Sequence, residues 1–430
     1  MALTGRVPLL LLLGTAALVL RPEGSTLLAW VGGVLVLVAL DVVLAASPTA
    51  LDVHRLPVRQ VRLGETGAST LLVTNTGGRR LRGLLRDAWQ PSAGATSNRH
   101  DLDLRPGDAR RLTTALAPTR RGDRRAEHVT VRSSGPLGLA ARQRSWPVLG
   151  RVRTLPPFTS RRHLPSRLAR LRDIDGRSAV RVRGQGTEFD SLREYVRGDD
   201  VRSIDWRASA RSRSVVVRTW QPERDRRVVL VLDTSRTSAA RSGDVPRLDA
   251  AMDAALLLAA LANRAGDHVD FLAGDRQVRA KVRSGGNKGV LSSLVDGMAD
   301  LEPVLGEANW PRLAGAISSL GRRRALVVLL TSLDPPAIEH GLLPVLPVLT
   351  QHHHVVVASV KDRDLSEMSR ARADATQVYS AAAAEQALRK RQHAAAVLGR
   401  LGVDVVDAEP DDLPVALTDH YLMLKSLGRL

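Results

Sequence analysis

The chain has 430 residues, enough for two or three domains, and its 44% hydrophobic content is that of a folded protein and not of a disordered one. Its formal net charge of +19 comes almost entirely from Arg, but aromatic residues make up only 3% and no base-stacking motif accompanies the charge, so anionic lipid headgroups or a compositional bias are favoured over nucleic acid as its explanation. The absence of Cys excludes disulfides and thiolate metal sites.

Two apolar runs open the chain, one over residues 7–20 and one over residues 26–46. The second run is long enough to cross a bilayer core, which takes about 20 helical residues, and Asp41 near its end can reach the interface. The first run is shorter and needs Arg6 to snorkel if it is to cross. We therefore predict a transmembrane helical hairpin over residues 1–46, with both ends on the same side of the membrane.

A secretory signal peptide is the alternative for the first run, with Arg6 as its charged start and the small residues before Leu18 as a cleavage region. The second run would then stop transfer, and the chain after it would again face the cytoplasm. Arg55, Arg59 and Arg62 follow the second run and agree with that orientation under the positive-inside rule. Both interpretations predict a protein of the inner or plasma membrane with its large C-terminal body in the cytoplasm.

Residues 51–150 contain short runs of alternating apolar and polar residues that are separated by turn residues. The run 61–88 alternates in this way around a Gly-containing turn at 74–78, and shorter runs continue the pattern. This spacing predicts a small antiparallel β-sandwich.

Residues 151–183 are rich in Arg and Pro and predict a linker with a short helix at 164–171. The following segment, 184–227, interleaves acids, bases and aromatic residues, and we call it the signature segment. Arg–carboxylate pairs would fix it on the next domain with its aromatic side chains as buried anchors, and the alternative is a docking surface for a partner. The candidate residues for either role are Glu188, Arg193, Tyr195, Asp199, Asp200, Arg202, Asp205, Trp206 and Arg211.

Five apolar residues at 228–232 predict a strand that is buried on both faces and ends at Asp233. Ser235 and Thr237 follow at alternate positions, so an extended loop would turn all three side chains toward one point. Hard divalent cations such as Mg²⁺ prefer oxygen ligands of this kind. The alternative is a metal-free scaffold in which Asp233 and Ser235 cap the following helix.

Strands and helices then alternate, which predicts a doubly wound α/β domain with a mostly parallel sheet over 228–430. Further strands are predicted at 268–272, 277–282, 325–331, 355–360 and 403–406, and helices at 248–265, 289–301, 311–320, 381–401 and 413–427. The functional face should lie at the carboxyl ends of the strands, where Asp233 and Thr331 both fall. We interpret His352, His353 and His354 as the polar edge of a strand, because no third metal ligand is spaced nearby.

The Asp-x-Ser-x-Thr loop at 233–237 resembles the metal-ion-dependent adhesion site of von Willebrand factor A domains, where a bound metal keeps one position open for a partner's carboxylate. The signature segment resembles that of the domain of unknown function 58 family, bacterial membrane-tethered proteins with a von Willebrand A-like, Rossmann-like domain. This resemblance rests on Gly184, Gly186, Glu188, Phe189, Leu192, Arg193, Tyr195, Gly198, Asp199, Asp200, Arg202, Ile204, Asp205, Trp206, Ala210 and Arg211.

The loop departs from a complete adhesion-type metal site at two points. Such a site would add a Thr from a second loop, but residues 307–312 contain none. It would also add an Asp directly after the strand that ends at Thr331, where this chain has Ser332. We therefore expect a degenerate site for Mg²⁺ or another divalent cation. Its candidate ligands are Asp233, Ser235 and Thr237, with Asp334 as a contributor through water.

Together these features predict a membrane-anchored, non-enzymatic protein that binds other proteins. The family resemblance implies a MoxR-type AAA+ ATPase as partner, with an assembly or chaperone-like role at the membrane. The chain has no phosphate-cradling GxxxxGK[ST] loop and is not predicted to be an ATPase itself. The alternative is a metal-dependent hydrolase that uses Asp233 and the carboxylates of the signature segment, and a third interpretation is a basic module that binds membrane surfaces or nucleic acid.

Overall fold

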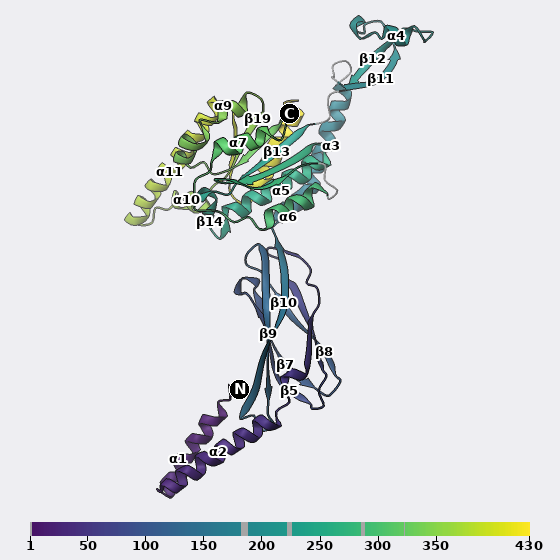
Figure 1. The fold of residues 1–430 in the computed structure, drawn as a ribbon. Helices are drawn as coiled ribbons and strands as arrows, with labels where there is room; N and C mark the ends of the chain where they lie inside the picture. The colour runs from purple at the N-terminus through teal and green to yellow at the C-terminus, as the bar shows by residue number, and fades with distance from the viewer. Residues whose placement is uncertain (1, 182–187, 222–225, 285–288, 322) are drawn as a thin grey trace. The chain divides into compact units, whose positions relative to one another are not determined.

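The computed structural model describes residues 2–181, 188–221, 226–284, 289–321 and 323–430, with the backbone alone over 175–181, 188–190 and 219–221. The chain divides into two compact units, Met1–Leu155 and Pro156–Leu430 (Figure 1).

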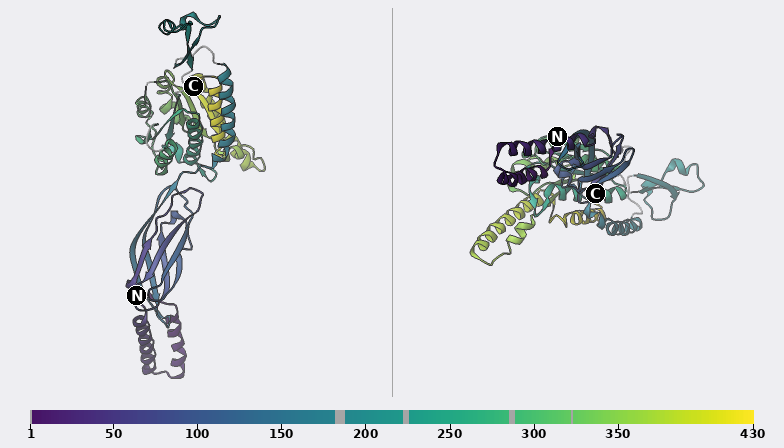
Figure 2. Two further views of the ribbon diagram at one scale, coloured as in Figure 1. Left: turned by 90° about the vertical axis from the view of Figure 1, so that its right-hand side faces the viewer. Right: turned by 90° about the horizontal axis from the view of Figure 1, so that it is seen from below.

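Two apolar helices begin the first unit, α1 (Arg6–Leu20) and α2 (Gly24–Leu44), and they lie side by side (Figures 1 and 2). Gly14 makes this contact close, because a Cβ there would stand 2.4 Å from the indole of Trp30. The Trp30 Nε1 donates a hydrogen bond of 3.0 Å to the carbonyl of Leu10. At about 1.5 Å per residue, α2 matches a bilayer core of about 30 Å. It is the one helix in the described residues that is long and apolar enough to span a membrane.

Asp41 joins α2 to the turn between strands β9 (Gly122–Ser134) and β10 (Ala140–Leu155). Its buried carboxylate accepts hydrogen bonds from the backbone N–H groups of Leu137 at 2.7 Å, Leu139 at 2.7 Å and Ala140 at 2.8 Å. Before α1, strand β1 (Ala2–Leu3) pairs with the first residues of β10. Asp41 therefore caps a turn of the β unit, where the sequence suggested a residue that reaches the membrane interface.

We expect Asp41→Ala to lower the free energy of unfolding by about 1–3 kcal/mol, because it leaves these backbone N–H groups without their charged acceptor. Thermal unfolding of the detergent-solubilised full chain measures this loss. Asp41→Asn should keep part of the stability, since an amide oxygen still accepts. Thr15→Ala on the exposed side of α1 is the matched control, and an equal loss in both proteins would contradict the capping role.

The rest of the first unit consists of two facing sheets. One has the strand order β1-β10-β9-β5-β7 with β3 paired to β10, and the other has the order β2-β4-β8-β6. Buried Leu and Val side chains of both sheets form one core between them, as the alternation in the sequence predicts. The additional strands are β2 (Leu51–Arg55), β3 (Val61–Arg62), β4 (Gly67–Asn75), β5 (Leu81–Trp89), β6 (Ala95–Thr96), β7 (Arg99–Leu104) and β8 (Ala109–Leu116).

A buried ion pair crosses this core. The Arg55 side chain is 4% exposed and that of Asp87 0% exposed, and two hydrogen bonds of 3.0 and 2.7 Å join them. Ser69 accepts a further bond from Arg55, and Trp89 and Thr114 donate to the Asp87 carboxylate. Arg55 is thus an internal residue of the β unit, and not the free flanking charge that the orientation argument used.

The linker expected over 151–183 is largely ordered structure. β10 continues to Leu155, and the short helix predicted at 164–171 extends through α3 (Leu164–Arg181). Arg167 of α3 pairs with Asp419 at 3.2 Å. Arg161 and Arg162 lie in a short 3₁₀ turn, Thr159–His163, and Pro156 and Pro157 lie between β10 and this turn.

The second unit is built on a sheet with the order β17-β16-β13-β18-β19-β20, in which only the β16–β17 pair is antiparallel. The unit is therefore mixed α/β, as predicted. Its strands are β13 (Arg227–Asp233), β16 (His268–Gly274), β17 (Val278–Val282), β18 (Leu326–Leu330), β19 (His354–Val360) and β20 (Asp404–Ala408). The main helices are α5 (Arg247–Arg264), α6 (Val290–Ala299), α7 (Trp310–Ser318), α9 (Leu346–Thr350), α11 (Ala375–Arg400) and α12 (Leu413–Ser426).

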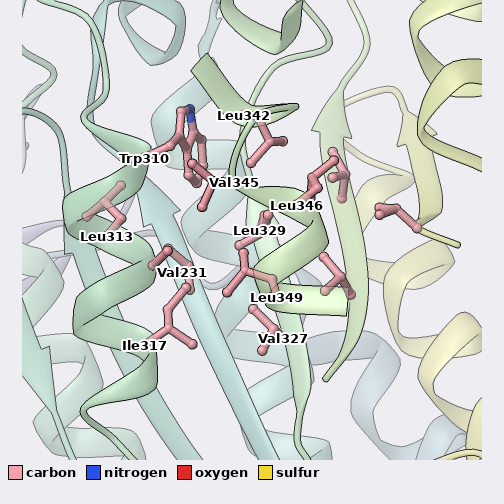
Figure 3. Packing of buried hydrophobic residues seen from close by; sticks show 14 of the residues in the cluster. Val231, Trp310, Leu313, Ile317, Val327, Leu329, Leu342, Val345, Leu346 and Leu349 are labelled. Carbon is pink, nitrogen blue, oxygen red and sulfur yellow. The ribbon is translucent and has the colours of Figure 1, made fainter. Parts of the chain in front are cut away.

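The central strand β13 is buried because both faces of the sheet are covered. Figure 3 shows one face, where Val231 lies in a cluster with Trp310 and Ile317 of α7 and with Leu349 of α9. Successive side chains of a strand point to opposite faces, and the alternate residues of β13 are equally buried on the face that α5 contacts. The carboxyl end of β13 is thereby held in a rigid frame.

Candidate functional site

The loop after β13 brings its three predicted oxygen ligands together. The Asp233 carboxylate accepts from the backbone N–H of Ser235 at 2.8 Å and from the Thr237 hydroxyl at 3.1 Å. The Ser235 and Thr237 hydroxyl oxygens are 3.2 Å apart. All three residues are buried. In the capping alternative, the helical element that follows is the short 3₁₀ helix η5 (Arg236–Ala239); Ser235 is its N-cap residue but makes no side-chain cap hydrogen bond, and the α-helix α5 begins only at Arg247.

Thr331 is a fourth member of this cluster. It follows β18 and donates a hydrogen bond of 2.6 Å to the Asp233 Oδ2. The sequence predicts Thr331 at the same edge of the sheet, but it was not among the predicted ligands. The predicted contribution from this strand was that of Asp334, because Ser332 occupies the position of the expected Asp. The backbone of residues 304–306 also contacts the loop, since Val304 N–H donates to Thr234 O and Arg236 N–H donates to Gly306 O.

Asp334 does not join the Asp233 cluster. Its carboxylate lies 3.4 Å from the Arg236 guanidinium, which also pairs with Glu307. These two acids raise the pKa of Arg236, with Glu307 as the larger contributor. Of the four predicted metal ligands, the structure therefore brings Asp233, Ser235 and Thr237 together and assigns Asp334 to a surface ion pair.

Burial raises the pKa of the Asp233 carboxyl above its ordinary value. Hydrogen bonds from Thr331, Ser235 and Thr237 lower it, and they offset the burial only in part. The donors that contact the ionised carboxylate are neutral groups, so its negative charge is not balanced by a contacting positive charge among the described residues. A bound cation would supply that charge, and the oxygens of Asp233, Ser235 and Thr237 are suitably arranged, because their separations of 3.1 and 3.2 Å are close to the edge of about 2.9 Å in an octahedron of Mg²⁺ ligands. Asp233, Ser235 and Thr237 are the residues that could hold the ion.

We expect the free energy of unfolding of the metal-free protein to decrease as the pH rises from the ordinary carboxyl range through the higher pKa of folded Asp233. The sign follows because the folded state holds this proton more tightly than the unfolded chain does. Asp233→Asn should flatten the slope, and Mg²⁺ should raise the melting temperature of the wild-type protein alone at neutral pH. Thermal unfolding across a pH series, with chelator or with Mg²⁺, measures both effects. Equal slopes in the two proteins would contradict the assignment.

The signature segment forms an antiparallel pair of strands, β11 (Glu188–Glu194) and β12 (Val216–Gln221). Arg193 binds Asp199 at 2.6 Å, and Asp205 binds Arg218 at 2.7 Å. The Arg193 guanidinium lowers the pKa of Asp199, while the Ala208 N–H and then Arg218 lower that of Asp205. These carboxylates are therefore fixed acceptors of hydrogen bonds.

The other candidates in this segment have smaller roles. Asp200 caps a 3₁₀ turn through the Arg202 N–H at 3.0 Å, and Tyr195 is half-buried. Arg211 is exposed in a turn, and the side chain of Glu188 lies outside the described residues.

Trp206 is exposed, where the sequence predicted a buried anchor. Its exposed fraction is 67%, and Val196 and Val201 are similarly exposed at 61% and 60%. The reason is local, because a two-stranded ribbon has no second layer of its own to cover the side chains that it presents. Large exposed apolar side chains gathered on one short segment are typical of a protein–protein contact.

A second polar cluster, formed by His354, Asp404 and His420, was not predicted from the sequence. Asp404 contacts both His354 and His420, and the other two neighbouring histidines, His352 and His353, are not members of this cluster. His354 and its two partners are 50 and 66 positions apart, so the spacing of residues gave no signal.

The structure thus defines a protein with one N-terminal apolar helix long enough to span a membrane and a mixed α/β body built on several sheets. The model of the family described as protein of unknown function DUF58 matches residues 191–398. This match confirms the resemblance to the family that the signature segment shows.

Known proteins add little beyond the family. No curated protein matches the chain. Among solved structures, it is similar to a PapD-like domain of human CEP192, with 12% identity, 25% of this chain and 89% of that chain covered, and a TM-score of 0.19. It is also similar to the CARDB domain of a Pyrococcus furiosus protein in complex with di-metal ions. The identity is 19%, 24% of this chain and 91% of that chain are covered, and the TM-score is 0.19. A protein of unknown function from Porphyromonas gingivalis is 20% identical, with 25% of this chain and 48% of that chain covered and a TM-score of 0.19.

Proposed function

We propose that the chain is a membrane-anchored, non-enzymatic interaction protein whose signature segment docks another protein. The observation that carries this proposal is the exposure of Val196, Val201 and Trp206 on a segment whose carboxylates Asp199 and Asp205 are already paired with Arg. Exposed aromatic residues lose more water-accessible area on binding than other side chains and often dominate the energetics of an interface.

Membrane anchoring by a helical hairpin, with the body in the cytoplasm, is part of the proposal. The apolar α2 supports anchoring. The pairing of β1 with β10 supports retention of α1 against cleavage as a signal peptide, because cleavage would remove a strand of the β unit. It also supports a common side for the N-terminus and that unit.

The second unit would act as a von Willebrand A-like domain, doubly wound and with a degenerate metal-ion-dependent adhesion site at Asp233. Convergence of the Asp233, Ser235 and Thr237 oxygens at the carboxyl end of a parallel strand supports this assignment. Mg²⁺ held there would leave positions for water or for an acidic group of a partner.

The partner that we propose is a MoxR-type AAA+ ATPase, which the resemblance to the family implies, in an assembly or chaperone-like role at the membrane. The hydrolase alternative has weaker support. Hydrogen bonds to the Asp233 carboxylate come from Ser and Thr groups, and the signature carboxylates Asp199 and Asp205 are held by Arg. Neither arrangement supplies an activated nucleophile.

The test is direct binding. The full chain in nanodiscs with anionic lipid should bind the purified ATPase of the same organism saturably in the presence of ATP, and repetition with Mg²⁺ or chelator separates metal-dependent from metal-independent docking. Empty nanodiscs serve as the control. Absence of binding by the folded chain in every condition would refute this partner.

A further inference from the structure

Three metal-ligating side chains meet at the edge of the sheet opposite Asp233. His354 is the first residue of β19, Asp404 is the first residue of β20, and His420 lies in α12. Because β13, β19 and β20 run parallel, the starts of β19 and β20 lie at the amino edge and the end of β13 lies at the carboxyl edge. The group is therefore separate from the candidate Mg²⁺ site.

Both imidazoles direct Nε2 at the same carboxylate oxygen. The His354 Nε2 is 2.8 Å and the His420 Nε2 is 3.1 Å from the Asp404 Oδ2, and one ligand atom of each residue lies within 4.8 Å of the other two. Ligands of a tetrahedral Zn²⁺ at about 2.0–2.1 Å from the metal are about 3.3 Å from each other. Both His–Asp contacts are thus within a few tenths of an ångström of the spacing between two ligands of such an ion.

We propose that His354, Asp404 and His420 form a binding site for Zn²⁺ or a similar divalent transition-metal ion. Two imidazole nitrogens and one carboxylate oxygen make a donor set that favours Zn²⁺ over Mg²⁺, whereas the all-oxygen set at Asp233 favours Mg²⁺. Three protein ligands leave one position for water.

The ligands are accessible enough to load in the folded protein. The side chains of His354 and His420 are 16% and 19% exposed, and that of Asp404 is 38% exposed. As a pair of partly solvated hydrogen bonds, the metal-free cluster contributes little stability. A metal would bind all three residues at once and join β19, β20 and α12. Because the unfolded chain lacks this arrangement, binding should stabilise the folded state.

The test uses the full chain in detergent, purified with a tag that contains no histidine and freed of metal. Titration with Zn²⁺ against a competing chromophoric chelator should show one site, and Zn²⁺ should raise the melting temperature. His354→Gln, Asp404→Asn and His420→Gln should each weaken Zn²⁺ binding at least about tenfold and abolish the rise. His352→Gln, at a neighbouring exposed histidine outside the cluster, is the control and should bind as the wild-type protein does.

Co²⁺ keeps the proposal testable if the variants are poorly folded. Loaded into the wild-type protein, it should give the intense visible absorption of tetrahedral coordination, and Zn²⁺ should displace it. Failure of the wild-type protein to bind Zn²⁺, a purely octahedral Co²⁺ spectrum, or wild-type affinity in three folded variants would each overturn the site.

Discussion

Arg55→Met should lower the free energy of unfolding of the β unit by about 3–5 kcal/mol, the loss expected when one partner of a buried ion pair is removed. The substitution keeps most of the apolar stem and removes the guanidinium, which pairs with Asp87 and lies 5.0 Å from the centroid of the Trp89 ring. Asp87 would remain fully buried, and Trp89 and Thr114 would be its remaining side-chain donors among the described residues.

The effect should be confined to the first unit, and hydrogen–deuterium exchange of the full chain can resolve it by following the amides of β5 and β9. Arg80→Met is a matched control, because Arg80 pairs with Asp103 at 2.6 Å on the surface of the same unit, where both side chains are about half exposed. Surface pairs contribute about 0–1 kcal/mol. Adding Asp87→Asn to Arg55→Met should restore part of the stability, because the buried charge is then gone. Similar exchange in the Arg55→Met and Arg80→Met proteins would contradict a buried pair.

Trp206→Ala should weaken binding of the proposed ATPase partner at least about 30-fold, which corresponds to the 2 kcal/mol or more of an interface hot spot. The melting temperature should be unchanged, since 67% of this residue is already exposed in the free chain. A structural anchor would behave in the opposite way and lower the melting temperature.

Tyr379→Ala provides the comparison for Trp206. Tyr379 is an aromatic residue that is 79% exposed on α11, outside the signature segment. Its removal should leave both the affinity and the melting temperature unchanged. Equal affinities of the wild-type and Trp206→Ala proteins would exclude this docking surface, while equal losses in the two variants would indicate non-specific apolar adhesion.

The sequence predicts best where the information is local. The run 228–232 predicts β13 because a strand covered on both faces needs uninterrupted apolar residues. Asp233, Ser235 and Thr237 are brought together by alternation within five residues, so their convergence also follows from the chain itself.

Contacts between distant residues could not be predicted in this way. Thr331 contacts Asp233 because β18 is the neighbour of β13 in the sheet. Asp334 instead pairs with Arg236, and the sequence pattern of a metal site contains no information about that pairing. Exposure of Trp206 was missed for a related reason. Its residue type favours burial, but the ribbon that carries it has no layer of its own to bury it.

The attachment of α1 and α2 to the β unit has a mechanical consequence. Strand β1 enters the sheet before α1, and Asp41 near the end of α2 holds the β9–β10 turn, so both ends of the helical pair are clamped. These two attachments restrict rotation of the helical pair relative to the β unit. In the proposed membrane-anchored state, a pull or a torque applied to the sheet would therefore tilt the two helices together as one rigid body.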